Sequence, residues 1–232
     1  MEKKRIWEID YLRVIAIVLM IIYHTAYDLN EFAGRNINLN SEFWVWYCKL
    51  ASPIFPFLSG VSSGFSEKGI VQKGLKILLV GLGITVVTFF ILGDQFIRYG
   101  VLHFLGTCML LYPLLSKLNV WLLAVLAATV ASLAKPLGRI DAGTGLLLPL
   151  GIKYQGFSTV DYYPLVPYLA AYIVGIIAYK LYYYKKQSLF SFSLENKFFT
   201  AISRNSLWIY LLHQPILLGA IYLYNQLLSW GY

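Results

Sequence analysis

RIWEIDYLRVIAIVLMIIYH, residues 5–24, decides how this chain folds. The stretch is long and apolar enough for a membrane-spanning helix, yet it carries Asp10 and Arg13 near its start and His24 at its end. A charge at the centre of a bilayer costs at least about 2.5–3.5 kcal/mol. We therefore expect these polar groups to face the interior of a helix bundle or a water-filled cavity.

The composition of the whole chain indicates an integral membrane protein. The 232 residues are 59% hydrophobic and 13% charged, with a mean hydropathy of +0.64, whereas soluble domains are about half apolar and a quarter charged. The formal net charge of +8 lies in short runs between apolar stretches, as membrane topology requires, so we expect no nucleic-acid partner. Cys48 and Cys108 lie in apolar segments, and we expect no disulfide framework and no metal site.

We expect an all-α, polytopic membrane helix bundle that forms a single domain over residues 1–232. A span needs about 20 mostly apolar residues. Seven stretches meet or approach this length, at about 9–29, 43–65, 74–93, 98–116, 119–134, 162–183 and 205–228. Two further pieces are predicted to lie at or near the interface: the short apolar GLLLPLGI (145–152), which re-enters the bundle or lies flat, and a helix within the inner loop 185–204.

The Lys and Arg residues of the loops predict the orientation. With the N-terminus inside, the inner segments hold 12 of these residues and the outer segments 5. Cytoplasmic loops carry the excess of positive charge. We therefore expect the N-terminus in the cytoplasm and the C-terminus outside. Because the sequence shows no targeting segment and no extracytoplasmic domain, we expect a multi-pass protein of a prokaryotic plasma membrane. The N-terminal apolar run is too long for a signal peptide and is predicted to be the first helix.

Four ionisable residues of the first helix fall on one face. At 100° per residue, Asp10, Arg13, His24 and Asp28 form a polar stripe. Arg13 and His24 are about 16 Å apart along the helix axis, so the cation is predicted near the inner surface and the imidazole nearer the outer one. Taken singly, Asp10 and Arg13 could be an interfacial ion pair, and His24 a neutral buried histidine.

Polar residues in two other spans extend this pattern. IRYGVLHFLG (97–106) brings Arg98 and His103, and NSLWIYLLHQP (205–215) brings Asn205, Ser206, Tyr210, His213 and Gln214. All three histidines of the chain thus lie in predicted spans. Histidine exchanges a proton near neutral pH, which suits general acid–base or acyl-carrying chemistry.

Four sequence blocks carry a resemblance to a known family. Arg5-x4-Asp10-x2-Arg13-x10-His24 resembles the first-helix signature of integral-membrane acyltransferases. Within that superfamily, the catalytic-domain family of heparan-alpha-glucosaminide N-acetyltransferase is similar in three more blocks: ASPIFPFLSGVSSG (51–64), GVLHFLG (100–106) and RNSLWIYLLHQ (204–214). The resemblance implies an enzyme that moves an acetyl group from cytosolic acetyl-CoA, without a metal, to an amine or hydroxyl of an extracytoplasmic glycan or lipid-linked sugar. By analogy it also suggests a homodimer.

The resemblance also implies a role for each matched residue. His24 would be the catalytic base or a transient acyl carrier, while His103 and His213 would position or deprotonate the acceptor. The donor-binding set would comprise an inner mouth of Asp10 and Arg13, a channel lined by Asn205, Ser206 and Tyr210, and in addition Arg98.

Two other classes of protein fit the same residues. Intramembrane His, Asp and Arg also mark the substrate paths of transporters, although no inverted repeat of the kind many transporters show is visible in the sequence. A haem-binding or structural membrane protein is the third reading, since His24 and His103 are predicted at similar depth. Acetyl-CoA binding would separate the enzyme from the transporter, and an absorption spectrum would detect haem.

Overall fold

The computed structural model of the chain is all-helical over the residues it describes, 6–230, with only the backbone described for 228–230. The predicted all-α class is confirmed. Lys3, Lys4 and Arg5, which contribute to the predicted orientation and to the first sequence block, lie outside the described residues. The chain divides into two compact units. The described residues before Pro56 and after Lys186 form the terminal unit, and Pro56–Lys186 form the central unit.

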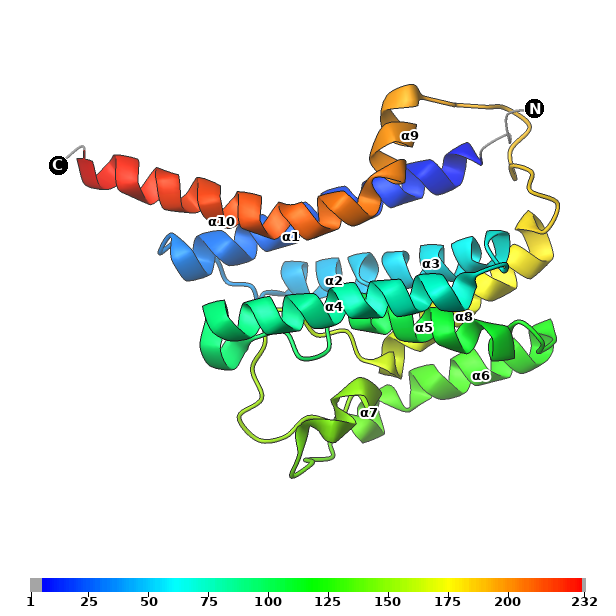
Figure 1. Ribbon diagram of the computed structural model, residues 1–232, viewed down its shortest axis with the longest axis horizontal. Coiled ribbons are helices and arrows are strands. Elements are labelled where there is room, and N and C mark those ends of the chain that lie inside the picture. Colours follow the sequence, from blue (N-terminus) through cyan, green and yellow to red (C-terminus); the bar gives the residue numbers. More distant parts are fainter. Residues whose placement is uncertain (1–5, 231–232) are drawn as a thin grey trace. The chain divides into compact units, whose positions relative to one another are not determined.

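The terminal unit joins the two ends of the chain. Helix α1 (Trp7–Phe32) runs beside α10 (Ser206–Trp230), and α9 (Lys197–Arg204) lies against α1 (Figure 1). Helix α2 (Glu42–Ala51) also contacts α1, because the Tyr47 hydroxyl donates to the Leu19 carbonyl at 2.8 Å. The first helix therefore finds its partners mainly among residues almost 200 positions away.

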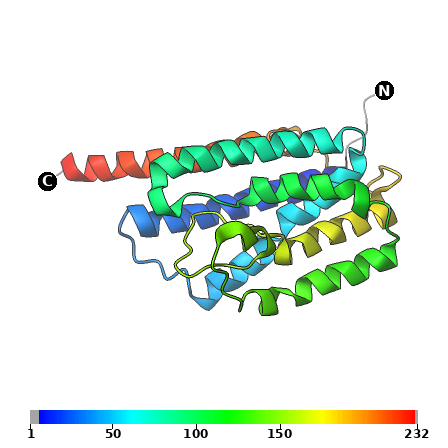
Figure 2. The same ribbon diagram turned by 60° about the horizontal axis from the view of Figure 1, so that its bottom comes forward.

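The central unit is built from two helix pairs. Helix α4 (Ile70–Leu92) packs on α5 (Val101–Leu115), and α6 (Val120–Ser132) packs on α8 (Leu165–Ala178) (Figures 1 and 2). The shorter elements are α3 (Ile54–Phe65), the 3₁₀ helices η1 (Gly93–Gln95) and η2 (Gly145–Leu150), α7 (Ala134–Leu137) and the π-helical turn η3 (Tyr179–Tyr183). The core of this unit includes Phe104, Leu123, Tyr172, Ile173 and Ile176, all of them fully buried.

Two glycines let α3 and α8 approach with their backbones almost in contact. A Cβ atom added to Gly60 would lie 2.0 Å from the carbonyl oxygen of Tyr172, and one added to Gly175 would lie 2.1 Å from that of Phe57. Neither contact is sterically allowed, so only glycine fits at these positions. The Ser63 and Tyr172 hydroxyls, 2.8 Å apart, add a buried hydrogen bond between the same helices.

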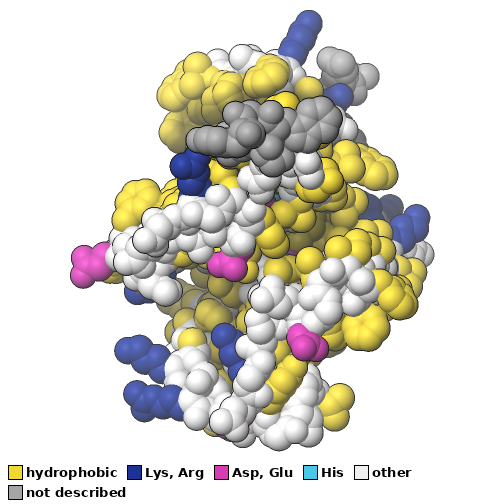
Figure 3. Space-filling view, turned by 90° about the vertical axis from the view of Figure 1, so that its left-hand side faces the viewer, with side chains coloured by type: hydrophobic (Ala, Val, Ile, Leu, Met, Phe, Trp, Pro, Cys, Tyr) yellow, Lys and Arg dark blue, Asp and Glu magenta, His cyan; other side chains and the backbone are white. Residues whose placement is uncertain are grey.

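Five of the described helices are long and apolar enough to cross a membrane. They are α1, α4 with η1, α6 with α7, α8 with η3, and α10 through Leu227, while α5 is apolar but only 15 residues long. Many large apolar side chains are exposed, including Phe90 at 80% and Trp121 at 82%, and apolar side chains also reach the surface on the face in Figure 3. Lipid is the natural neighbour of such surfaces, so this is a multi-pass membrane protein. The count of seven spans and the orientation stay predictions.

Three predicted segments take specific forms in the structure. The span predicted at 43–65 is divided between α2 and α3, with the break at Ser52 and Pro53. Proline lacks a backbone N–H and disfavours helical geometry in the residue before it. GLLLPLGI contains η2, whose first turn is capped by the Thr144 hydroxyl, and its position in the membrane stays a prediction. The helix predicted within 185–204 is α9, capped by Asn196.

Candidate functional site

The first half of the polar stripe on α1 meets α9 through one serine. The Ser203 hydroxyl donates to Asp10 Oδ1 at 2.6 Å and accepts from Arg13 Nη1 at 3.3 Å, and Thr200 Oγ1 lies 3.5 Å from Asp10 Oδ2. Asp10 and Ser203 are buried. A buried carboxylate that accepts hydroxyl protons is stabilised without leaving either partner unsatisfied. This end of the stripe therefore holds α9 on α1 while keeping a guanidinium in place.

The second half of the stripe meets α10 through a pair of histidines. The rings of His24 and His213 are in edge-to-face contact, with centroids 4.9 Å apart and planes at 68°. His213 Nδ1 is hydrogen-bonded to the carbonyl oxygen of Tyr210, so in the neutral ring Nδ1 carries the proton and Nε2 is the basic nitrogen. The contact brings together two rings from opposite ends of the chain.

An acidic residue and an amide complete this cluster one turn further along. Gln214 Nε2 donates to Asp28 Oδ1 at 2.8 Å, and the side chain of Asp28 is fully buried. The prediction that Asp10, Arg13, His24 and Asp28 share one face is confirmed, because all four contact the C-terminal segment of the chain.

His103 belongs to the central unit, where both of its ring nitrogens have partners. The backbone N–H of Gly100 donates to Nδ1 at 3.3 Å, so the proton of the neutral ring is on Nε2, which lies 3.1 Å from Thr85 Oγ1. The Thr85 hydroxyl in turn donates to the carbonyl oxygen of Ile97 at 2.7 Å. This chain of hydrogen bonds ties the start of α5 to α4, which is a structural role; the catalytic role of His103 stays a prediction.

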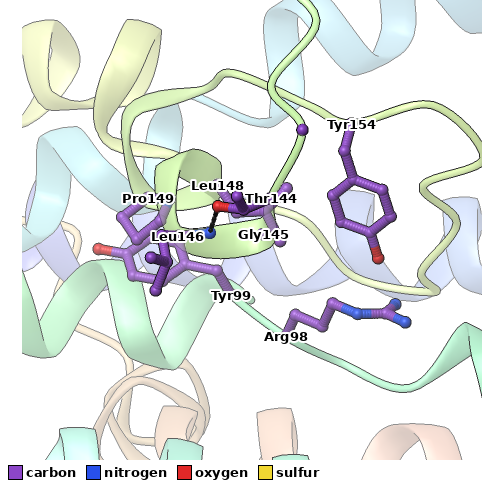
Figure 4. A pocket seen from close by; sticks show the side chains of 9 residues that line it. Arg98, Tyr99, Thr144, Gly145, Leu146, Leu148, Pro149 and Tyr154 are labelled. Atoms are coloured by element: carbon purple, nitrogen blue, oxygen red, sulfur yellow. Dashed lines mark hydrogen bonds between the residues drawn. The ribbon is translucent and has the colours of Figure 1, made fainter.

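Arg98 lines an open cavity of about 450 Å³ in the central unit. Figure 4 shows its side chain near Tyr154, with Leu146 and Pro149 of η2 on another wall. Arg98 Nη1 donates to the carbonyl oxygens of Asp94 (3.0 Å) and Ser158 (2.8 Å), and the guanidinium lies 4.0 Å from the ring centre of Phe96. These contacts hold two loops together, and donor binding by Arg98 stays a prediction.

A tyrosine before α8 holds the wall of this cavity. The Tyr162 hydroxyl donates to the Leu148 carbonyl at 2.7 Å. This hydrogen bond joins η2 to the residues that precede α8.

The three remaining predicted residues lie along the junction of α9 and α10. Asn205 follows α9, and its side-chain amide donates to the Ala201 carbonyl at 2.9 Å. Ser206 begins α10. Tyr210 is one turn before His213, with ring centres 5.6 Å apart. Of these three, Tyr210 is the one that the structure places beside the histidine pair.

Some residues of the site carry no sequence signal. Ser203 contacts two charges of α1, but nothing in its spacing links position 203 to position 10. The same holds for Asp161, whose carboxylate accepts from the backbone N–H of Val101 at 3.0 Å and caps α5. Within the described part of the chain, no three His, Cys, Asp or Glu residues are grouped so that they could hold a metal ion.

A model of one protein family matches nearly the whole chain. The family is described as heparan-alpha-glucosaminide N-acetyltransferase, catalytic, and the match covers residues 5–215. All four resembling blocks lie within that range, as do Asp28, Ser203 and Gln214. No curated protein and no solved structure is significantly similar to the chain.

Proposed function

The chain belongs to the catalytic heparan-alpha-glucosaminide N-acetyltransferase family, and from this premise we propose that it transfers an acetyl group from cytosolic acetyl-CoA to an amine or hydroxyl of an extracytoplasmic sugar. The family implies a membrane acetyltransferase that uses acetyl-CoA as co-substrate. The observation that carries the proposal is the contact of His24 with His213, two proton-accepting rings brought together from the ends of the chain.

The histidine pair supplies the proton transfer that the reaction needs. When the acceptor nitrogen or oxygen attacks the thioester carbonyl, it must lose a proton, the C–S bond breaks, and the sulfur of CoA leaves as a thiolate. His213 Nε2 is the basic nitrogen of its ring and suits the acceptance of that proton. His24 either assists as a second base or carries the acetyl group between donor and acceptor.

The other end of the stripe suits the phosphates of the donor. Arg13 is a fixed cation, held by Ser203 on the face of α1 that also carries His24. Guanidinium groups bind phosphate oxygens through charge-assisted hydrogen bonds. With the predicted orientation, Arg13 lies toward the cytoplasm, where CoA is found.

Binding of acetyl-CoA to the purified protein tests this proposal. We expect wild-type protein to bind acetyl-CoA and the Arg13→Ala variant to bind it about 10- to 100-fold more weakly, the effect of losing a hydrogen bond to a charged group. Dephospho-CoA serves as the comparison for the donor phosphates. Arg35→Ala is the matched control, because Arg35 is an exposed arginine of the same unit that donates to Tyr224. Absence of binding at millimolar acetyl-CoA would refute the acetyltransferase and make the stripe a solute path.

A further inference from the structure

Two buried oxygen atoms beside the histidine pair have no donor. Asp28 Oδ2 and Gln214 Oε1 are both inaccessible to solvent, and among residues 6–230 no group donates a hydrogen bond to either. The partner atoms of the same two side chains, Asp28 Oδ1 and Gln214 Nε2, are bonded to each other at 2.8 Å. The two oxygens without a donor therefore belong to neighbouring side chains that hold each other in place.

Two buried acceptors without donors cost free energy unless a ligand or water donates hydrogen bonds to them. Leaving a buried acceptor without a donor costs about 1–3 kcal/mol, and more for a charged group. Turning the Gln214 amide over would not help, because it would set its oxygen against a carboxylate oxygen. Asp28 also has no cationic partner within the described residues, although its side chain is fully buried.

The position of the pair indicates what fills it. Asp28 is one helical turn after His24 on α1, and Gln214 is the residue after His213 on α10. The two helices that carry His24 and His213 therefore each also carry a buried acceptor without a donor. A ligand that presents two N–H or O–H donors at this place would satisfy both oxygens and have one of its groups beside the histidine rings.

We propose that Asp28 Oδ2 and Gln214 Oε1 form the binding site for two neighbouring N–H or O–H groups of the sugar acceptor. This inference rests on the proposed function, since it takes the His24–His213 contact as the reacting centre. Neighbouring hydroxyl or amine groups on a sugar ring have the required chemistry. A cationic amine would in addition neutralise the buried carboxylate, so Asp28 is the residue that sets the preference between amine and hydroxyl acceptors.

Calorimetric titration of the purified full-length protein with glucosamine and with methyl α-glucoside tests the site. Asp28→Asn keeps the oxygen that accepts from Gln214 but turns Oδ2 into a donor, and it should weaken glucosamine binding ten-fold or more and the glucoside less. Gln214→Met keeps a similar side-chain length but removes both Oε1 and the Nε2 donor that holds Asp28, and it should weaken both ligands. Glu31→Gln is the matched control, since Glu31 is an exposed carboxylate one turn from Asp28 on the same helix.

The outcomes separate this site from the acetyl transfer itself. The sugars are tested up to roughly 100 mM, which is about 100 times a millimolar dissociation constant. If neither sugar binds the wild-type protein at that concentration, the proposal is wrong. It is also wrong if folded Asp28→Asn and Gln214→Met bind both sugars as the wild type does. That result would mean that ordered water, and not a sugar, donates hydrogen bonds to the two oxygens. Acetyl-CoA binding, measured in parallel, reports on the proposed function. Lost sugar binding with intact donor binding in the variants is the expected result.

Discussion

Ser203 and Gln214 show what sequence reasoning reaches at the scale of single residues. Helical periodicity predicts that Asp10, Arg13, His24 and Asp28 share a face, because the angle between positions follows from geometry alone. It does not predict which side chains receive them. Ser203 is one of many serines in the chain, and its contact with Asp10 spans 193 positions. The stripe could thus be predicted, whereas its partners emerged only from the packing of α9 and α10 on α1.

Replacing His24 by alanine should remove most of the transfer activity. Loss of a general base typically costs about 10²- to 10⁴-fold in rate, and we expect a fall of that size in kcat for CoA release from acetyl-CoA in the presence of a sugar acceptor. The folded protein should survive, because the lost ring contact with His213 is worth only about 0.5–1.5 kcal/mol.

The thermal unfolding curve of His24→Ala distinguishes a loss of catalysis from a loss of stability. A variant with an unfolding midpoint near that of the wild type and no transfer supports the catalytic role of His24. Full transfer by the same variant would show that the reaction does not use this ring.

At the scale of elements, the close contact of α3 with α8 depends on two glycines whose role the sequence alone does not predict. Two prolines and two glycines in 52–64 indicate an irregular span, and the break at Pro53 follows from proline chemistry. That Gly60 faces Gly175 could not be predicted, since it requires the crossing point of two helices that are 115 positions apart. Lengths and ends of helices follow from local composition, but crossing points follow from the whole fold.

Alanine at either of these glycines should separate the two helices. The added Cβ would lie 2.0 Å from the Tyr172 carbonyl oxygen in Gly60→Ala, and 2.1 Å from the Phe57 carbonyl oxygen in Gly175→Ala. Such overpacking typically costs about 1–3 kcal/mol or more, so both variants should unfold at lower temperature in detergent. Gly83→Ala is the control on exposed α4, where nothing lies within 4 Å of the new atom. There alanine should stabilise the helix by up to about 1 kcal/mol. Equal unfolding temperatures for all three variants would refute the close contact.

At the scale of the whole molecule, the structure confirms the predicted class of protein. Length and hydropathy predict a multi-pass membrane protein, and five described helices meet the requirement for crossing. The chain divides into two units, and residues 56–186 of the central unit separate the two sequence segments of the terminal unit. The sequence does not predict this division. No composition shift or linker marks its boundaries, because both units are bundles of the same apolar helices.

Cysteine labelling tests the predicted orientation in intact cells. After Cys48 and Cys108 are replaced by serine, Gly143→Cys in the predicted outer loop should react with a membrane-impermeant maleimide. Ser191→Cys in the predicted inner loop should react only after the cells are made permeable. Both positions are exposed in the structure. The reverse pattern would place the N-terminus outside, and Arg13 on the wrong side of the membrane for cytosolic CoA.

The pairing of α1 with the C-terminal helices also governs how the protein is made. Asp28 leaves the ribosome 186 residues before Gln214, and Arg13 190 residues before Ser203. At a synthesis rate of about 5–20 residues per second, α1 waits on the order of 10–40 seconds for these partners. During that interval the acidic, basic and imidazole groups of α1 must contact water or the insertion machinery, because their partners on α9 and α10 have not yet been synthesised. Nascent chains that stop short of α9 should therefore leave α1 exposed to the quality-control proteases of the membrane.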